Sequence, residues 1–322
     1  MKNTIALLFT GIVFNQSAWG QTSEAEKNFR SASTDTVNGW KKGGVIGLSV
    51  SQASFTNWAA GGQNSLSVNG LISMYANYKK EKSSWDNLFD LGYGFLQQGK
   101  NGDLIKTDDK IDFSSKYGRA AAKHWYYAAL LNFKTQMTAG YAYPNDSVEI
   151  SGFLAPAYLL GALGMDYKPN NNLSAFIAPV TVKTTIVNHQ RLADEGAYGV
   201  DPAEYDTAGN FISHGKMIRN EFGGYVRVIY KKDFFKDKSV SLLTKLDIFS
   251  NYIHNPENLD ISWETIFSFK VNKYISATLT THLLYDDDII IAVDSNGDGV
   301  IEARGPRTQF KQVLGIGISY KF

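Results

Sequence analysis

The sequence predicts an all-β fold, namely a transmembrane antiparallel up-and-down β-barrel of about 12 strands. Apolar and polar residues alternate over long stretches, and aromatic residues make up 13% of the chain, with 29 glycines and only 7 prolines. Beyond residue 20, no apolar run reaches the roughly 18 residues that a transmembrane helix needs. Strands of a membrane barrel alternate in this way because one face contacts lipid and the other lines the lumen.

The predicted strands follow a two-residue period. On the last one, Phe310, Leu314 and Ile318 fall on one face and Lys311 on the other. Pro179 cannot donate to a strand ladder, so a bulge is expected there. The same pattern predicts strands over residues 43–55, 64–79, 86–97, 109–121, 124–137, 156–168, 172–187, 217–231, 238–252, 259–271, 274–287 and 308–322.

The predicted connections alternate in length. Short turns are expected at residues 80–84, 122–123, 170–171, 232–237 and 272–273, and longer loops at 56–63, 98–108, 138–155, 188–216, 253–258 and 288–307. Bacterial outer-membrane barrels have short periplasmic turns and long extracellular loops. The alternation therefore favours a membrane barrel over a soluble sandwich.

The first 20 residues have the pattern of a cleaved secretory signal peptide. A base at Lys2 is followed by an apolar run from Ile5 to Phe14, and Ala18-Trp19-Gly20 forms an Ala-x-Gly cleavage site. We expect cleavage after Gly20 and location in the outer membrane. Residues 21–42 are polar and are predicted to form a flexible periplasmic segment or, alternatively, a plug in the lumen, and residues 43–322 are predicted to form the barrel.

Composition excludes several classes of protein. Without Lys2, 31 basic and 31 acidic residues remain of the 32 and 31 in the full chain, so no nucleic-acid footprint is present. The absence of cysteine excludes disulfides, cysteine metal sites, thiol catalysis and a lipoprotein anchor.

The expected partners are outer-membrane lipid and the barrel-assembly machinery.

The chain resembles an uncharacterised family of outer-membrane β-barrels from Bacteroidota, catalogued as a domain of unknown function. The terminal Tyr320-x-Phe322 also resembles the signal that outer-membrane assembly machinery recognises. The family resemblance implies the fold and the location but no activity. The segments that carry it are Ser54 to Gly62, Lys106 to Asp112, Phe153 to Tyr158, Gly199 to Tyr205, Tyr285 to Asp288 and Leu314 to Phe322.

One candidate metal site lies between the last two strands. Asp294, Asn296 and Asp298 match the first ligand positions of a calcium loop, and Glu302 could contribute a further oxygen. Gly305 stands where the pattern requires a bidentate Glu. The alternative is a polar turn in an extracellular loop, and no other cofactor is expected.

Charged residues of both signs are predicted to line the lumen. In a narrow barrel, opposite charges mostly pair across the interior, whereas a stripe of one sign would indicate an ion-selective pore. We favour structural pairing. These residues are Asp90, Asp112, Lys116, Lys134, Asp166, Arg219, Glu221, Arg227, Lys245, Asp247, Glu264, Lys270 and Lys311.

No catalytic constellation is apparent in the sequence. The five histidines are scattered, and His282 is predicted to point inward with no matching serine beside it. An outer-membrane lipid hydrolase is therefore a remote alternative, and the protein is expected not to be an enzyme. We expect a narrow channel for a small polar or amphipathic solute, with the loop at residues 188–216 constricting its outer mouth. The alternative is a non-conducting structural or surface-interaction barrel, or a subunit of an envelope complex.

Overall fold

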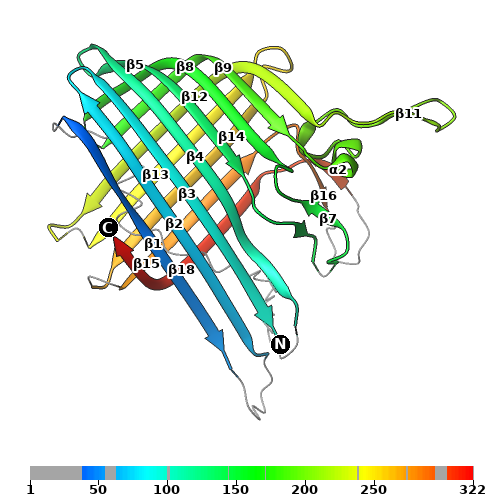
Figure 1. The fold of residues 1–322 in the computed structure, drawn as a ribbon, viewed down its shortest axis with the longest axis horizontal. Helices are drawn as coiled ribbons and strands as arrows, with labels where there is room; N and C mark the ends of the chain where they lie inside the picture. The colour runs from blue at the N-terminus through cyan, green and yellow to red at the C-terminus, as the bar shows by residue number, and fades with distance from the viewer. Residues whose placement is uncertain are drawn as a thin grey trace, which may run out of the picture.

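The computed structural model describes residues 38–54, 63–99, 102–143, 145–170, 172–237, 239–272, 275–293 and 303–321. Long antiparallel strands close into a barrel in the order β1-β18-β15-β14-β13-β12-β9-β8-β5-β4-β3-β2 (Figure 1). The predicted fold class is thereby confirmed. The strands are β1 (Gly39–Ala53), β2 (Ser65–Lys80), β3 (Ser83–Gln98), β4 (Leu104–Ala122), β5 (Trp125–Thr135), β8 (Ala157–Asn170), β9 (Leu173–Ile186), β12 (Ile218–Phe234), β13 (Val240–Asn251), β14 (Leu259–Lys270), β15 (Ile275–Tyr285) and β18 (Gln309–Lys321).

Two predicted boundaries were wrong. β1 begins at Gly39 rather than at residue 43, so part of the segment assigned to a flexible extension belongs to the barrel wall. β4 begins at Leu104, which reduces the expected long loop at 98–108 to residues 99–103. In both cases the strand begins earlier than expected, because charged or polar residues that suggested a loop take part in the ladder.

The predicted bulge at Pro179 is confirmed. On one side of β9, Gly223 pairs with Thr181 and Tyr225 with Ala178, and the register also shifts against β8 at this place. Because proline has no N–H to donate, the strand accommodates it as an extra residue outside the ladder.

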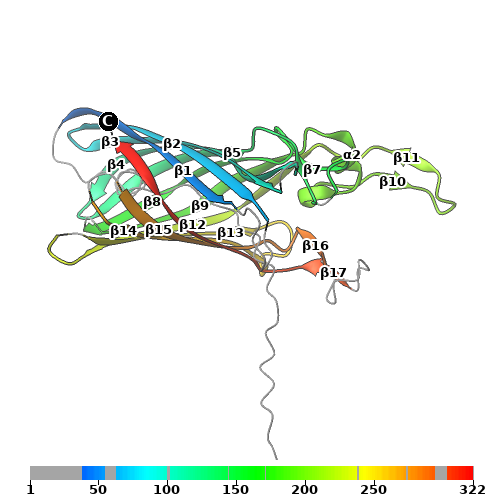
Figure 2. The ribbon, with the colours of Figure 1, turned by 90° about the horizontal axis from the view of Figure 1, so that it is seen from below.

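The two ends of the barrel differ. At one end the strands are joined by tight turns, as where β2 ends at Lys80 and β3 begins at Ser83. At the other end the loops carry small elements that the sequence did not indicate, and Figure 2 places them together beyond the strands. These are β6 (Gly140–Tyr141), β7 (Glu149–Ser151), α2 (Gln190–Asp194), η1 (Ala197–Gly199), β10 (Glu204–Tyr205), β11 (Phe211–Ser213), β16 (Ile290–Val293) and β17 (Ala303–Pro306).

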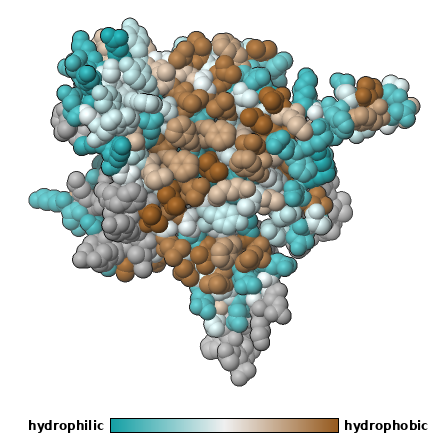
Figure 3. All heavy atoms as spheres, in the orientation of Figure 1, coloured by the Kyte–Doolittle hydropathy of each residue, from teal (hydrophilic) through white to brown (hydrophobic). Residues whose placement is uncertain are grey.

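The barrel is apolar outside and polar inside. On β5, Tyr127 and Leu131 are 62% and 45% exposed, whereas Leu130 and Asn132 between and beyond them are buried. Figure 3 shows apolar side chains gathered in a broad band across the strands. This distribution is typical of a barrel whose outer wall contacts lipid. In the parts of the chain that the structure describes, no helix has the length and apolar character needed to cross a membrane.

The apolar band predicts a high cost for an outward-facing charge. Leu131→Lys should destabilise the lipid-embedded protein by about 2–4 kcal/mol, because the ammonium would lie in hydrocarbon. Urea unfolding in lipid vesicles measures this difference. The control is Ile212→Lys in β11, where the side chain is also exposed but lies in a loop hairpin, and the change should be within about 0.5 kcal/mol. Equal, small effects at both positions would contradict a lipid-facing wall.

Candidate functional site

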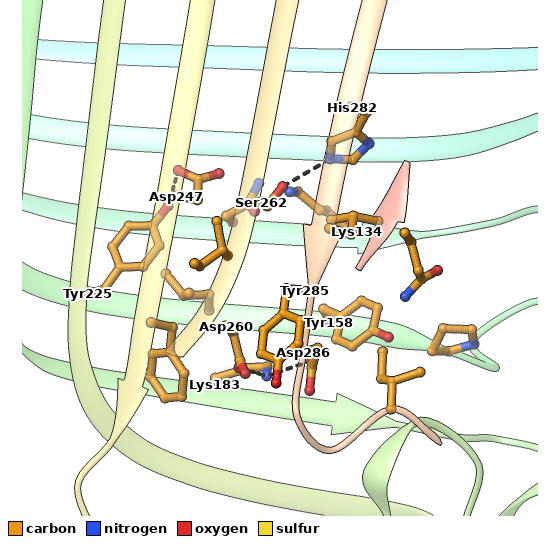
Figure 4. Close-up of a pocket in the computed structure, with 18 of the residues that line it drawn as sticks. Lys134, Tyr158, Lys183, Tyr225, Asp247, Asp260, Ser262, His282, Tyr285 and Asp286 are labelled. Carbon is orange, nitrogen blue, oxygen red and sulfur yellow. Dashed lines mark hydrogen bonds and ion pairs between the residues drawn. The ribbon is translucent and has the colours of Figure 1, made fainter. Parts of the chain in front are cut away.

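The lumen contains a cavity of about 400 Å³ near the end that carries the long loops. It is lined from β4, β5, β8, β9, β12, β13, β14, β15 and β18, because alternate residues of each strand point inward. Figure 4 shows its charged and aromatic side chains facing one another across the space. Its apolar wall consists of Leu160, Phe249, Ile261, Leu284 and Ile289 and the rings of Tyr158, Tyr225 and Tyr285.

A second cavity, of about 350 Å³, adjoins the first and shares Lys134, Ser262 and His282 with it. Its other lining residues are mostly charged, and they include Lys106, Asp108, Lys110, Asp112, Lys245, Glu264 and Lys311. The two cavities together form an upper lumen that has an apolar wall on one side and a charged wall on the other.

Lys183 of β9 is the centre of an ion cluster at the rim. Its ammonium lies 2.6 Å from Asp260, 3.3 Å from Glu221 and 3.6 Å from Asp286. Lys183, Asp260 and Asp286 were not among the predicted lumen residues, although each lies on an inward-facing position near a strand end. Such positions resemble loop residues in sequence, so the strand period gave no firm assignment for them.

Arg219 of β12 connects this cluster to the loops. Its guanidinium contacts Glu221 at 3.2 Å and Asp288 at 2.6 Å, and it donates a hydrogen bond to the carbonyl of Gly199 at 2.8 Å. Gly199 has φ +80°, and an added Cβ would lie 2.6 Å from the Arg219 guanidinium. A glycine is therefore required for the close approach of η1 to the barrel rim.

The loop at residues 188–216 packs on the rim through a small core of its own, made of Ala155, Val187, Leu192, Ala193 and Val200. The Tyr198 hydroxyl donates to the carbonyl of Ile150 at 2.6 Å, and burial raises the pKa of Tyr198 to about 12. The β10–β11 hairpin projects away from the barrel in Figures 1 and 2. Among the residues described, none from 188–216 lines either cavity, so these cavities give no support for the expected constriction at this loop, which stays a prediction.

The lumen is narrow at its middle. Arg227 is paired with Asp247 through contacts of 2.6 and 3.2 Å, and the Tyr225 hydroxyl donates to Asp247 at 2.7 Å. The next cavity toward the tight-turn end has only about 80 Å³ and is lined by Arg227 and Lys245, among others. We call this section, Tyr225 with Arg227 and Asp247, the waist.

A further ion cluster lies beyond the waist. Asp166 of β8 contacts Lys116 at 2.6 Å and Lys168 at 3.2 Å, and it accepts a hydrogen bond from Ser174 at 2.7 Å. These side chains come from β4, β8 and β9, so the cluster connects three strands across the interior.

The predicted lumen residues are distributed along this path. The cavities and the waist hold Asp112, Lys134, Arg227, Lys245, Asp247, Glu264 and Lys311; the rim holds Arg219 and Glu221; and the section beyond the waist holds Asp90, Lys116 and Asp166. Lys270 was wrongly included, because it is the last residue of β14 and its side chain is exposed at the barrel end.

The remaining candidate positions fall at the edge of what is described. Asp294, Asn296, Asp298 and Glu302 lie outside the described residues, and so does Phe322. The backbone of Tyr320 pairs with Ile46 at the barrel closure. Within the described parts of the chain, no group of three or more His, Asp or Glu side chains could hold a metal ion.

The expectation that no serine accompanies His282 was wrong. The Ser262 hydroxyl lies 3.0 Å from Nε2 of His282 on the neighbouring strand. Glu264 is directly opposite His282 in the register and forms an ion pair with Lys245 at 3.6 Å. The pair faces the lumen cavities, whereas hydrolysis of membrane lipid would need these groups on the outer wall.

Comparison with known proteins adds little about activity. A family described as "Protein of unknown function (DUF3078)" matches residues 50–141, which contain two of the segments that carried the resemblance, Ser54 to Gly62 and Lys106 to Asp112. No curated protein matches the chain.

Two solved outer-membrane structures are similar in outline. An outer membrane channel from Pseudomonas putida F1 is 9% identical with a TM-score of 0.38, and the alignment covers 91% of this chain and 97% of that one. The β domain of the Bordetella autotransporter BrkA is 9% identical with a TM-score of 0.30, over 88% and 97% of the two chains. We base the site on the geometry of this chain alone.

The waist predicts a strong asymmetry between single and double substitutions. Asp247→Leu should destabilise the barrel by about 3 kcal/mol, because it leaves the Arg227 guanidinium buried without its partner. The double variant Arg227→Met with Asp247→Leu should recover most of that loss, as measured by urea unfolding in vesicles. If the double variant were as unstable as the single one, the pair would not be the source of the loss.

Proposed function

We propose that this protein is an integral outer-membrane β-barrel that forms a narrow channel for a small polar or amphipathic solute. The observation that carries the proposal is the set of lumen cavities: two adjoining cavities of about 400 and 350 Å³ near the loop end and one of about 80 Å³ toward the turn end. A barrel that served only as a membrane anchor would have no need for open lumen volume of this size.

The membrane location rests on the outer wall. A closed barrel leaves no unpaired strand edge in hydrocarbon, and the exposed side chains of this wall are largely apolar. The predicted signal peptide would direct the chain to the same compartment. Residues 1–37, which include it, lie outside the described residues.

The narrowest part of the proposed path lies at and beyond the waist, not at the loop 188–216. The Arg227–Asp247 and Lys116–Asp166 pairs project into the interior and balance each other in charge. A lumen that carries both positive and negative side chains at its narrowest part would select only weakly between anions and cations. This proposal includes no enzymatic role.

The rival function is a non-conducting barrel that presents its loops to partners. The small volume beyond the waist, about 80 Å³, favours it, because paired charges can close a lumen completely. Single-channel recording distinguishes the two. The mature protein should give discrete current steps in a planar bilayer. A variant that lacks residues 21–37 should give the same steps if this segment is not needed for conduction. The deletion stops before β1, which begins at Gly39.

Removal of the ion pair beyond the waist should widen the path. We expect Lys116→Ser with Asp166→Ser to raise single-channel conductance about twofold or more, because both substitutions replace a charged side chain in the lumen with a shorter one. The matched control is Lys216→Ser with Asp201→Ser, an exposed pair of similar length at 2.7 Å in the loops, which should leave conductance unchanged. Silence from the folded wild type and from both variants would overturn the channel and favour the rival function.

A further inference from the structure

We propose that the upper lumen binds an amphipathic anion, a small carboxylate with an apolar chain, and that Lys134 receives the carboxylate. The inference deepens the proposed function, on which its biological use rests, although binding can be measured without conduction. Lys134 is the central residue because it lines both large cavities.

Lys134 has no ion pair or hydrogen bond within 4 Å among the residues that the structure describes, although several carboxylates line the same cavities. Asp109 is occupied by Lys106 at 2.9 Å and by the backbone N–H groups of Met137 and Thr138 at 2.7 and 2.8 Å. An ammonium that faces a cavity without a partner is available to a ligand.

Three further carboxylates of these walls are also engaged. Asp112, directly opposite Lys134 in the register, accepts a hydrogen bond from Asn132 at 2.7 Å. Asp247 is held by Arg227 in the waist, and Glu264 faces Lys245 at 3.6 Å. None of the three lies within 4 Å of the Lys134 ammonium in the described structure, so an anion could bind there without breaking a direct ion pair.

The wall around Lys134 favours an anion further. Lys245, Lys311 and His282 line the same cavity, and the Ser262 hydroxyl beside His282 supplies a hydrogen-bonding group. In Figure 4, Lys134, Ser262 and His282 lie close together at one end of the drawn cavity, with the tyrosines beyond them. A carboxylate placed there would find its charge partner on β5 and polar neighbours on β14 and β15, which face the same cavities.

The rest of the cavity fits an apolar chain. Leu160, Phe249 and Leu284 line it together with the faces of Tyr158 and Tyr225. A volume of about 400 Å³ is within the range of small-molecule pockets, and such pockets combine apolar walls with a few fixed polar groups. An eight-carbon fatty carboxylate, octanoate, matches this division between one charged end and an apolar body.

A cationic amphiphile is the competing ligand, because the rim carries more carboxylates than cations. However, Asp260, Glu221 and Asp286 all converge on Lys183, and Asp288 contacts Arg219 at 2.6 Å. Each of these acids already contacts a cation, whereas no acid lies within 4 Å of the Lys134 ammonium among the described residues. The geometry therefore favours the anion.

The test is calorimetric titration of the full mature protein in phosphatidylcholine nanodiscs, with empty nanodiscs as the blank for partitioning into lipid. The probes are octanoate, octanol and octylamine. We expect octanoate to bind wild type more tightly than either analogue. Lys134→Gln should weaken octanoate binding roughly tenfold and leave octanol binding unchanged, since one charge-assisted contact is lost. Lys134→Arg should retain most of the affinity.

The matched control is Lys123→Gln, in the tight turn immediately before β5, where the side chain is exposed. It should bind octanoate like wild type. Equal octanoate affinity in Lys134→Gln and wild type, with both shown folded, would overturn the inference, as would tighter binding of octylamine. Octanoate binding without current would leave this site standing and reject the channel, and current without octanoate binding would do the reverse.

Discussion

Closure of the β-sheet is the constraint on which the rest of the molecule depends. In hydrocarbon no water can satisfy a backbone N–H or C=O, so every strand needs a partner on both sides. The first and last strands supply the final pairing, from Val45 opposite Lys321 to Leu48 opposite Ile318. This seam is short compared with the ladder between β1 and β2, which runs from Gly39 to Ala53. The stability of the barrel therefore depends on a few pairs that join its two ends.

Closure also determines what lies inside. Once the register is fixed, each strand must place alternate residues in the lumen, and an interior made only of charges of one sign would repel itself. The described interior avoids this by pairing, as with Arg227 and Asp247 at the waist and Lys116 and Asp166 beyond it. These pairs cross between strands, so they also hold the wall in one register.

The sequence predicted those features that depend on local order. The two-residue period identified each barrel strand, and Pro179 indicated its bulge, because both signals act within a few residues. What it missed depends on cross-strand register. Ser262 and His282 are twenty residues apart in sequence and meet only because β14 and β15 align Glu264 with His282. Lys183 and Asp260 meet across the lumen from β9 and β14, which no local pattern could indicate. Lys270 was wrongly assigned to the lumen for a different reason. Its position in the two-residue alternation is that of an inward-facing residue, but β14 ends there.

Arg227 and Lys134 differ in how their charges are compensated along the lumen. A buried cation without a partner is costly, so at the narrow waist Arg227 has a bidentate carboxylate and a neighbouring tyrosine hydroxyl held to the same acid. Lys134 also faces inward, but among the described residues no acid lies within 4 Å of its ammonium, so that water or a ligand has to solvate the charge. The two large cavities provide that space. The interior therefore holds Arg227 in a direct ion pair at the waist, whereas the Lys134 ammonium faces open volume.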